Sequence, residues 1–340
     1  MKNILAILIV YTASAASSSA ACFSDSAQFY FNKGMQEKAA KHFMIASRHF
    51  EKALSFDAKY TDAYLANAYS NMEMKQTDIA KANFAKVYEM DPGNNIAVKE
   101  LAHLYFDHRQ WNKAIELANK CKDCDDADRI IGISLYQKED FLQAEEFLQK
   151  AILKSPEDAE TLYTLARTQI DLEEYSKATP YFEKAVRLNP AKSLWAYELG
   201  LLYYTNNNYK NAVILFETAL VNNYNRSDDF NENYGYALLY TGNYDKGEEN
   251  LMNVYRKKPA NKVIVRDIAQ ILYSQKQYDR SLVYCQKLME TNSKDGVALY
   301  QAGLNFIKKG EKEKGQALCD QGIELEPALR SKKTKVELGF

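Results

Sequence analysis

Two cysteines spaced as C-x-x-C, Cys121 and Cys124, are the residues of this sequence best suited to chemistry. Such a pair can form a disulfide, exchange electrons with another thiol, or supply half of a metal site. The carboxylates of Asp123, Asp125 and Asp126 stand beside it, and their charge disfavours the thiolate, which is the reactive form. The spacing leaves open a local disulfide or two free thiols, ahead of a redox or metal-binding role.

A metal site would need further ligands, and His103, Asp107 and His108 are the nearest candidates in the sequence. If this segment is a hairpin of two helices, both histidines lie near the end of its first helix, whereas the cysteines end the second. A rise of 1.5 Å per residue then separates them by roughly 15 Å, too far for one zinc shell. We expect no metal and no cofactor here, with His103 as a binding contact and His108 as a solvated loop residue.

Sequence motifs of the common enzyme classes are missing. No glycine-rich phosphate loop follows a strand pattern, and no G-x-S-x-G elbow occurs. The four histidines form no pair of nucleophile and base. The adjacent carboxylates Glu173–Glu174 and Glu248–Glu249 are typical of a solvated surface. We therefore expect a protein that is not an enzyme.

The first 21 residues differ from the rest of the chain. Lys2 gives a positive start, an apolar run covers 4–11, and 13–21 contain only Ala and Ser. This is the layout of a cleaved secretory signal peptide, and its apolar run is too short for a membrane-spanning helix. Cleavage after Ala21 would leave Cys22 first, as in bacterial lipoproteins, although Ser19 stands where their leucine is usual. The alternative is a free N-terminal thiol.

The composition is that of a soluble folded protein. Charged residues make up 26% of the 340, Gly and Pro are few, and the formal net charge is −1. Helix formers dominate, so few hairpins of strands can be present. The near-balance of charge argues against a nucleic-acid partner.

A repeat of about 34 residues organises everything after the leader. One series of small residues recurs with this spacing, a second follows each member twelve residues later, and an aromatic residue falls between the two in most copies. The first series is Gly34, Ala68, Ala102, Gly132, Ala166, Gly200, Gly235, Ala269 and Gly303, and the second runs from Ala46 through Ala80 to Gly315.

Small residues at this spacing are what two packed antiparallel helices require. Helix axes approach to 8–10 Å only where the facing side chains are small, and larger apolar groups then fill the space beside the crossing. Proline, as at Pro92, Pro156 and Pro190, ends the second helix because it lacks the N–H that the next turn needs. Each copy is therefore predicted to be a helical hairpin.

This pattern resembles the tetratricopeptide repeat family over Ala27 to Leu329, and its strongest copy is Ala159 to Lys192. The resemblance implies an all-α fold, a right-handed α-solenoid (superhelix) of about nine helix-turn-helix repeats. The expected divisions are a signal peptide at 1–21, an N-terminal lead at 22–26, repeats at 27–60, 61–94, 95–124, 125–158, 159–192, 193–227, 228–261, 262–295 and 296–329, and a C-terminal tail at 330–340.

Individual copies depart from the family pattern. The first carries Lys33 and Glu37 at positions that are usually apolar, and the third is four residues short. The last has Gly315, Cys319 and Gly322 on its second helix, so we expect a loosely held C-terminal end.

Members of the family bind partners in a groove lined by the first helix of each repeat. At those positions this sequence is unusually aromatic, which suits binding because tyrosine combines contact area with a polar tip. The alternative is that many of these residues pack between adjacent repeats. The residues carried over are Tyr69, Phe106, Tyr136, Tyr163, Arg167, Tyr197, Tyr204, Tyr236, Tyr240, Tyr273 and Tyr300, with the best-supported cluster running from Tyr197 to Tyr240.

Charged residues on the same face are mixed, which suits a peptide better than a polyanion. A clamp for a C-terminal carboxylate, found in some family members, is disfavoured because Lys99 faces His103 where asparagine is needed. The charged positions are Lys99, Arg129, Arg167 and Arg266 with Asp107, Asp171, Asp229 and Glu232.

These observations predict a non-enzymatic scaffold or adaptor that holds a peptide or helix of another protein in a tyrosine-rich groove. The leader places it in the bacterial cell envelope, periplasmic or outer-membrane-associated, with membrane contact only through a lipid on Cys22. The alternatives are a thiol redox protein that uses Cys121 and Cys124, or a glycan-binding envelope protein.

Overall fold

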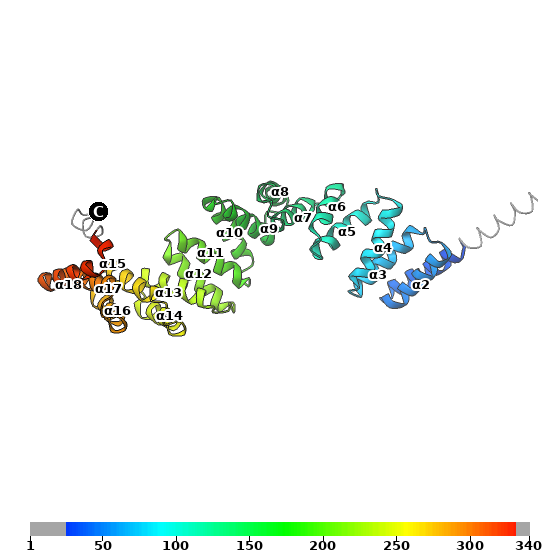
Figure 1. The fold of residues 1–340 in the computed structure, drawn as a ribbon. Coiled ribbons are helices and arrows are strands. Elements are labelled where there is room, and N and C mark those ends of the chain that lie inside the picture. The colour runs from blue at the N-terminus through cyan, green and yellow to red at the C-terminus, as the bar shows by residue number, and fades with distance from the viewer. Residues whose placement is uncertain (1–24, 331–340) are drawn as a thin grey trace, which may run out of the picture. The chain divides into compact units, whose positions relative to one another are not determined.

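The computed structural model describes residues 25–330, and in that range every regular element is a helix (Figure 1). The signal peptide, Cys22 and residues 331–340 of the expected tail lie outside the described residues. None of the helices within 25–330 has the length and apolar character needed to cross a membrane.

Contacts divide the chain into two compact units, 1–181 and 182–340. The first unit begins, in its described part, with a helix over 25–39. It continues through α2 (Phe43–Phe56), α3 (Thr61–Glu73), α4 (Thr77–Met90), α5 (Asn95–Asp107), α6 (Trp111–Lys120), α7 (Ala127–Gln137), α8 (Phe141–Lys154) and α9 (Ala159–Asp171), and the boundary falls inside α10 (Tyr175–Leu188).

The second unit continues the alternation of two helices and a turn. Its elements are α11 (Ser193–Thr205), α12 (Tyr209–Val221), α13 (Asp228–Tyr240), α14 (Tyr244–Lys257), α15 (Val263–Ser274), α16 (Tyr278–Thr291), α17 (Gly296–Lys308), α18 (Lys312–Leu325) and a final 3₁₀ turn, η1 (Pro327–Leu329).

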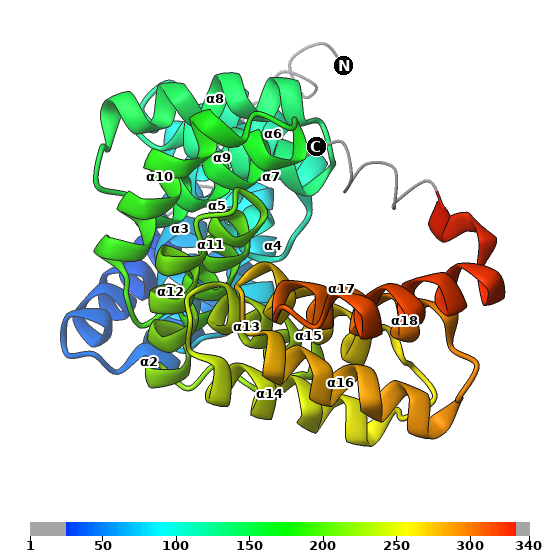
Figure 2. The same cartoon turned by 90° about the vertical axis from the view of Figure 1, so that its left-hand side faces the viewer.

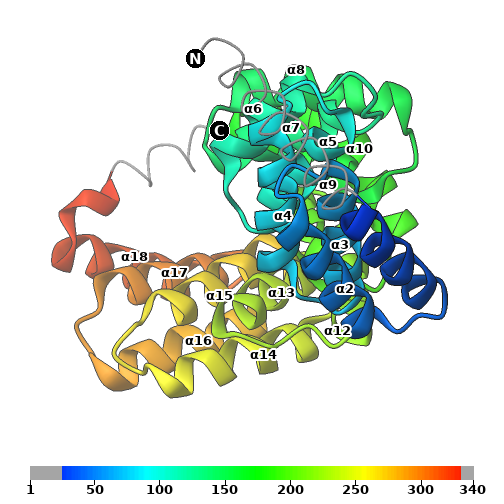
Figure 3. The same ribbon diagram turned by 90° about the vertical axis from the view of Figure 1, so that its right-hand side faces the viewer.

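Consecutive helices pack as hairpins, α3 with α4 and α5 with α6 in the first unit (Figure 3), and α11 with α12 in the second. The predicted all-α fold of tandem helix-turn-helix repeats is confirmed. First helices begin at Thr61, Asn95, Ala127, Ala159, Ser193, Asp228, Val263 and Gly296, against expected repeat starts of 61, 95, 125, 159, 193, 228, 262 and 296. The sense of the superhelix stays a prediction.

The small residues of the first series let one large side chain per hairpin reach the partner helix. A Cβ added at Gly200 would stand 2.8 Å from the Phe216 ring, and one at Gly132 would stand 2.8 Å from Leu148. In both pairs the large residue lies sixteen positions after the small one, on the facing helix. Phe84 and Phe182, fully buried, hold the same position in their hairpins.

Each turn inside a hairpin contains one residue with a left-handed backbone. After Lys75 (φ 58°), the amide of Gln76 donates to the Asn71 carbonyl at 2.8 Å, which is the hydrogen bond that ends a helix in a Schellman motif. These turns were not predicted, because glycine, the usual residue at this position of the motif, occupies few of them. The set is Lys41, Lys75, Arg109, Glu139, Glu173, Asn207, Gly242, Lys276 and Gly310.

The last hairpin, α17 and α18, contradicts the expectation of a loosely held C-terminal end (Figure 2). A Cβ at Gly303 would lie 2.5 Å from the Gly315 carbonyl oxygen, and one at Gly322 would lie 2.7 Å from the Gly296 oxygen. Glycines on both helices therefore bring the two backbones into contact. The prediction was wrong because it counted the side chains lost and not the closer approach that their loss allows.

Candidate functional site

A cavity of about 310 Å³ opens on the face formed by α11, α13 and α15 in the second unit. These are the first helices of three successive hairpins, and α13 contacts both of the others. Residues one repeat apart lie side by side on these neighbouring first helices, so each of the three helices contributes to one continuous wall. The lining residues are Tyr204, Tyr236, Tyr240, Asp267, Gln270, Ile271 and Ser274.

Tyr204 and Tyr240 line one side of the cavity, and Tyr209 supports them from behind. The Tyr240 ring stacks on that of Tyr209, with centroids 4.1 Å apart and an angle of 10° between the planes. Tyr209 in turn meets the edge of Tyr204 at 5.5 Å and 66°. Both arrangements are favourable for the ring quadrupoles, so the aromatic wall is held in place by the protein alone.

Asp267 and Tyr236 form the polar base of the cavity. The Tyr236 hydroxyl donates to Oδ2 of Asp267 at 3.0 Å. Burial raises the pKa of Asp267, and the hydrogen bond from Tyr236 opposes that rise. Burial and the neighbouring Asp267 carboxylate raise the pKa of Tyr236 above its ordinary value, so its hydroxyl stays a donor at neutral pH.

The other hydroxyls behave alike. Burial, with contributions from Tyr240 and Tyr209, raises the pKa of Tyr204 to about 12. Burial and Tyr209 raise the pKa of Tyr240 as well. The phenols of this wall therefore stay neutral near pH 7 and can donate and accept hydrogen bonds, and Asp267 adds a carboxyl group to them.

Two predicted groove residues of the second unit are packing residues instead. Tyr197, 9% exposed, stacks on Tyr224 at 4.6 Å and meets Phe230 at 5.4 Å. Tyr300, 5% exposed, belongs to the apolar cluster around Ile323. Tyr197 therefore packs against the next hairpin and Tyr300 packs within the last one, and neither lines the cavity.

Tyr273 and several predicted residues take part in an aromatic pair that closes the turn of their own hairpin. The two members are five residues apart. The first lies in the last turn of one helix, and the second is the first residue of the next helix. The pairs are Phe106–Trp111 (5.8 Å), Tyr136–Phe141 (5.8 Å), Tyr204–Tyr209 (5.5 Å) and Tyr273–Tyr278 (5.8 Å). Part of the aromatic excess thus stabilises turns.

The remaining predicted residues of the first unit have polar partners. The Tyr69 hydroxyl donates to Glu100 at 3.0 Å, and burial together with that carboxylate raises its pKa to about 12. Arg167 donates to the Tyr163 hydroxyl at 3.2 Å. These side chains lie on first helices of the first unit.

Two of the predicted groove cations link neighbouring repeats. Arg129 on α7 pairs with Asp158 at 2.9 Å, and Arg266 on α15 pairs with Asp295 at 2.8 Å. Each aspartate is also the N-cap of the next first helix, α9 or α17. Burial by itself would raise the pKa of Asp158, but hydrogen bonds from Thr161 and the charge of Arg129 hold it below its ordinary value.

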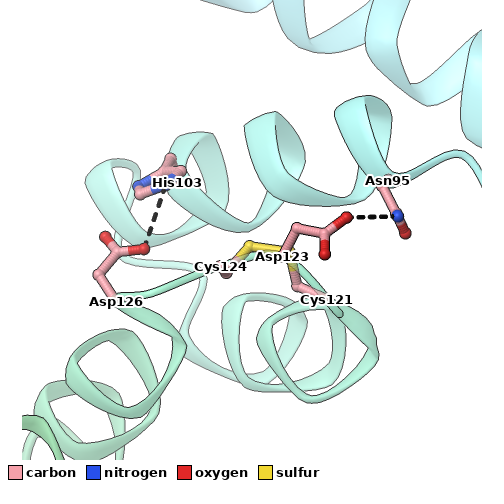
Figure 4. Close-up of a disulfide and its surroundings, with 6 residues drawn as sticks. All are labelled: Asn95, His103, Cys121, Asp123, Cys124 and Asp126. Carbon is pink, nitrogen blue, oxygen red and sulfur yellow. Dashed lines mark hydrogen bonds and ion pairs between the residues drawn. A yellow bond between two sulfur atoms is a disulfide. The ribbon is translucent and has the colours of Figure 1, made fainter. Parts of the chain in front are cut away.

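The structure joins Cys121 and Cys124 in a disulfide in the loop between α6 and α7 (Figure 4). Cys124 is 7% exposed, and the partly buried Cys121 packs against the core of the first unit. The bond therefore closes the shortened third repeat. The other thiols of the described chain, Cys285 and Cys319, are buried, and burial raises the pKa of Cys285 to about 12.

The loop that contains the disulfide lies along α5. Asn95 donates to Asp123 at 2.8 Å, and His103 lies 3.6 Å from Asp126 (Figure 4). His103 therefore lies beside this loop, and the partly buried His108 lies 3.3 Å from Lys81. The expected distance between the histidines and the cysteines stays a prediction. Within 25–330 no three His, Cys, Asp or Glu side chains are arranged to hold a metal ion.

Sequence reasoning missed Asp267, Gln270, Ser274 and Tyr209. Gln270 falls at a groove position, but a search for aromatic residues passes over it. Tyr209 was assigned to the turn, and its stacking on Tyr240 of the next hairpin depends on tertiary structure. Asp267 directly follows the groove residue Arg266, and only its contact with Tyr236 reveals its place at the cavity.

Comparisons with known proteins agree with the repeat architecture. The family model for the tetratricopeptide repeat matches residues 163–230. No curated protein matches the sequence. Among solved structures, the C-terminal part of a TPR repeat-containing protein from Cytophaga hutchinsonii is 18% identical with a TM-score of 0.51, over 69% of this chain and 98% of that one.

Two further solved structures are similar at lower TM-scores. YrrB, described as a TPR protein with an unusual peptide-binding site, is 23% identical with a TM-score of 0.40 over 55% of this chain and 97% of that one. PilF of Pseudomonas aeruginosa is 18% identical with a TM-score of 0.35 over 70% of this chain and 94% of that one. The match to the family model covers 163–230, and the tandem helical hairpins of the described chain have the architecture of a tetratricopeptide repeat array, a fold that supports a scaffold for protein–protein interaction.

Proposed function

We propose that this protein is a non-enzymatic scaffold that holds an extended or helical segment of a partner protein on the face of α11, α13 and α15. The observation that carries the proposal is the cavity whose walls come from three successive first helices. A partner chain laid across them meets a new helix at each repeat, as peptide recognition in a groove requires.

The chemistry of the wall supports a protein ligand. Tyrosine brings a large contact area with little side-chain entropy to lose, and here Tyr204 and Tyr240 are already positioned by Tyr209. Gln270 and Ser274 are exposed at the rim and supply donors and acceptors for a partner backbone.

The proposed setting is the bacterial cell envelope, and it is supported by the leader over 1–21 alone. The mass of the mature N-terminus tests it. A diacylglyceryl group on Cys22 would mean an outer-membrane-associated lipoprotein, and a chain starting at Ala16 or at unmodified Cys22 would mean a periplasmic protein. An intact Met1 terminus on protein isolated from the native cell would contradict export.

Site-specific photo-crosslinking tests the binding face. Benzoylphenylalanine in place of Gln270 should capture one polypeptide segment in envelope extracts, identified by mass spectrometry. The matched control is the same label at Gln286, an exposed residue of the second helix α16, which should not capture it. Because both sites are exposed and polar, neither label should disturb the fold.

The double substitution of Tyr204→Ala and Tyr240→Ala should abolish that crosslink, whereas Tyr175→Ala, at a tyrosine that is 44% exposed in α10, should not. Circular dichroism would verify that each variant keeps its helix content. Equal capture by the double variant, or capture of glycan in place of polypeptide, would contradict the proposal.

A further inference from the structure

We propose that the cavity lined by Tyr204, Tyr236, Tyr240 and Asp267 accepts a basic side chain of the partner, arginine in preference to lysine, so that the ligand is a basic segment. This inference rests on the proposed function and names the chemistry of what the face holds. It follows from the tyrosines that border the cavity, the hydrogen bonding of the Asp267 carboxylate and the balance of charge around them.

The carboxylate has capacity for a further donor. Tyr236 occupies Oδ2 of Asp267, and within the described residues no hydrogen bond or ion pair reaches Oδ1. A half-buried carboxylate that lacks a cation is unfavourable by itself. A guanidinium would supply both the missing charge and the missing N–H donors.

The surrounding charges favour a cation. Burial raises the pKa of Glu232, and Asp229 and Asp267 raise it further, while Lys258 opposes them. Arg266, the basic residue that the sequence places on this face, is engaged with Asp295. The carboxylates near the cavity therefore repel one another, and a bound cation would relieve that repulsion.

The aromatic wall adds an attraction that a carboxylate alone does not provide. Ring faces carry negative charge density and attract cations, more strongly where water is displaced. Tyr204, Tyr236 and Tyr240 come from two neighbouring helices and border the same space as Asp267. A planar guanidinium can stack on a ring while it donates to a carboxylate, which an ammonium group cannot do.

The test uses capped peptides of glycine and serine that contain two arginines, with matched peptides in which lysine or citrulline replaces arginine. Citrulline keeps the shape and loses the charge. The full chain is labelled with ¹³C on its tyrosine rings, and dissociation constants are read from the NMR shifts of Tyr204 and Tyr240 at physiological salt. We expect the arginine peptide to bind most tightly, lysine more weakly, and citrulline about tenfold more weakly than arginine.

The key variant is Asp267→Asn, which keeps an acceptor for Tyr236 and removes the charge. It should weaken the arginine peptide about tenfold and leave the citrulline peptide unchanged. The control Glu249→Gln removes the same charge from an exposed position of α14 and should change neither constant. Equal binding of arginine and citrulline, absence of binding, or equal effects of the two variants would overturn the inference.

The crosslinking experiment separates this inference from the proposed function. A segment captured at Gln270 that contains an arginine or lysine at the crosslink would support both. A captured segment without any basic residue would leave the scaffold function standing and overturn the basic-ligand inference. Failure to capture any segment would instead count against the scaffold function itself.

Discussion

Replacing Gly303 by alanine should loosen the last hairpin, and the size of the effect follows from the distances at its crossing. The new Cβ would lie 2.5 Å from the Gly315 oxygen, 2.6 Å from Cys319 Sγ and 2.8 Å from the Cys319 amide nitrogen. Ordinary contacts begin near 3.4 Å, so α17 and α18 must separate by about 0.9 Å, the difference between 3.4 and 2.5.

Two of the three obstructing atoms belong to the backbone and cannot rotate away. Overpacking of this kind destabilises by about 3 kcal/mol. Alanine recovers about 1 kcal/mol because it favours the helix over glycine. We expect a net loss of about 2 kcal/mol, which corresponds to a roughly 30-fold increase in the opening of the hairpin.

Hydrogen–deuterium exchange with mass spectrometry would measure this locally, since repeat arrays open in segments. Amides of α17 and α18 should exchange roughly 30-fold faster, and those of α11 and α12 should be unchanged. Lys308→Ala, at an exposed residue of the same helix, should change exchange little. Gly310→Ala, with φ 96° and no atom within 4 Å of the added Cβ, should lose only about 1 kcal/mol from its backbone. Unchanged or slower exchange in Gly303→Ala would refute the backbone contact.

Further predictions concern turns, charges and caps. Glu139→Gly should raise the free energy of unfolding, measured by urea denaturation, by about 0.5 to 1 kcal/mol, because φ is 63° there and glycine adopts that angle without strain; no gain would argue against the left-handed turn. Asp267→Asn should be more stable than the wild type at pH 7, because a raised folded pKa means that stability falls as pH rises above the ordinary value of 3.8; thermal unfolding across pH should show the advantage vanish below that value. Asp158→Asn should behave oppositely, since its depressed folded pKa contributes stability above the ordinary value that is lost as pH falls; an equal deficit at pH 7 and pH 2 would contradict this. Asp295→Ala should destabilise by about 2 kcal/mol through the lost cap of Ala298 and the lost partner of Arg266, and chemical denaturation checks it.

The sequence predicted the hairpins well because small residues such as Ala68 and Gly200 determine where helices cross, and a 34-residue period repeats that information many times. The left-handed turns were not predictable, since Lys75 and Glu139 adopt an angle that their residue types disfavour. Their conformation is imposed by the hydrogen bonds that end each first helix.

The candidate site was predictable only in part. Tyr204, Tyr236 and Tyr240 were named from the period, but the same rule also selected Tyr197 and Tyr300, which are buried and do not line the cavity. The 34-residue period predicts only which face of its helix a residue occupies. Whether a tyrosine on that face meets solvent depends on the neighbouring repeat, as the stacking of Tyr197 on Tyr224 shows.

The pairing of Arg129 with Asp158, and of Arg266 with Asp295, means that one repeat completes the helix start of the following one. In a linear array, each junction contributes its own interface energy, so junctions with such an ion pair should resist stretching or heat better than junctions without one. Truncation after the eighth repeat would keep Asp295 but remove α17, the helix that Asp295 caps, and truncation after the fourth would likewise keep Asp158 and remove α9. Shortened versions of this protein should therefore end at other junctions, where no aspartate paired with an arginine loses the helix that it caps.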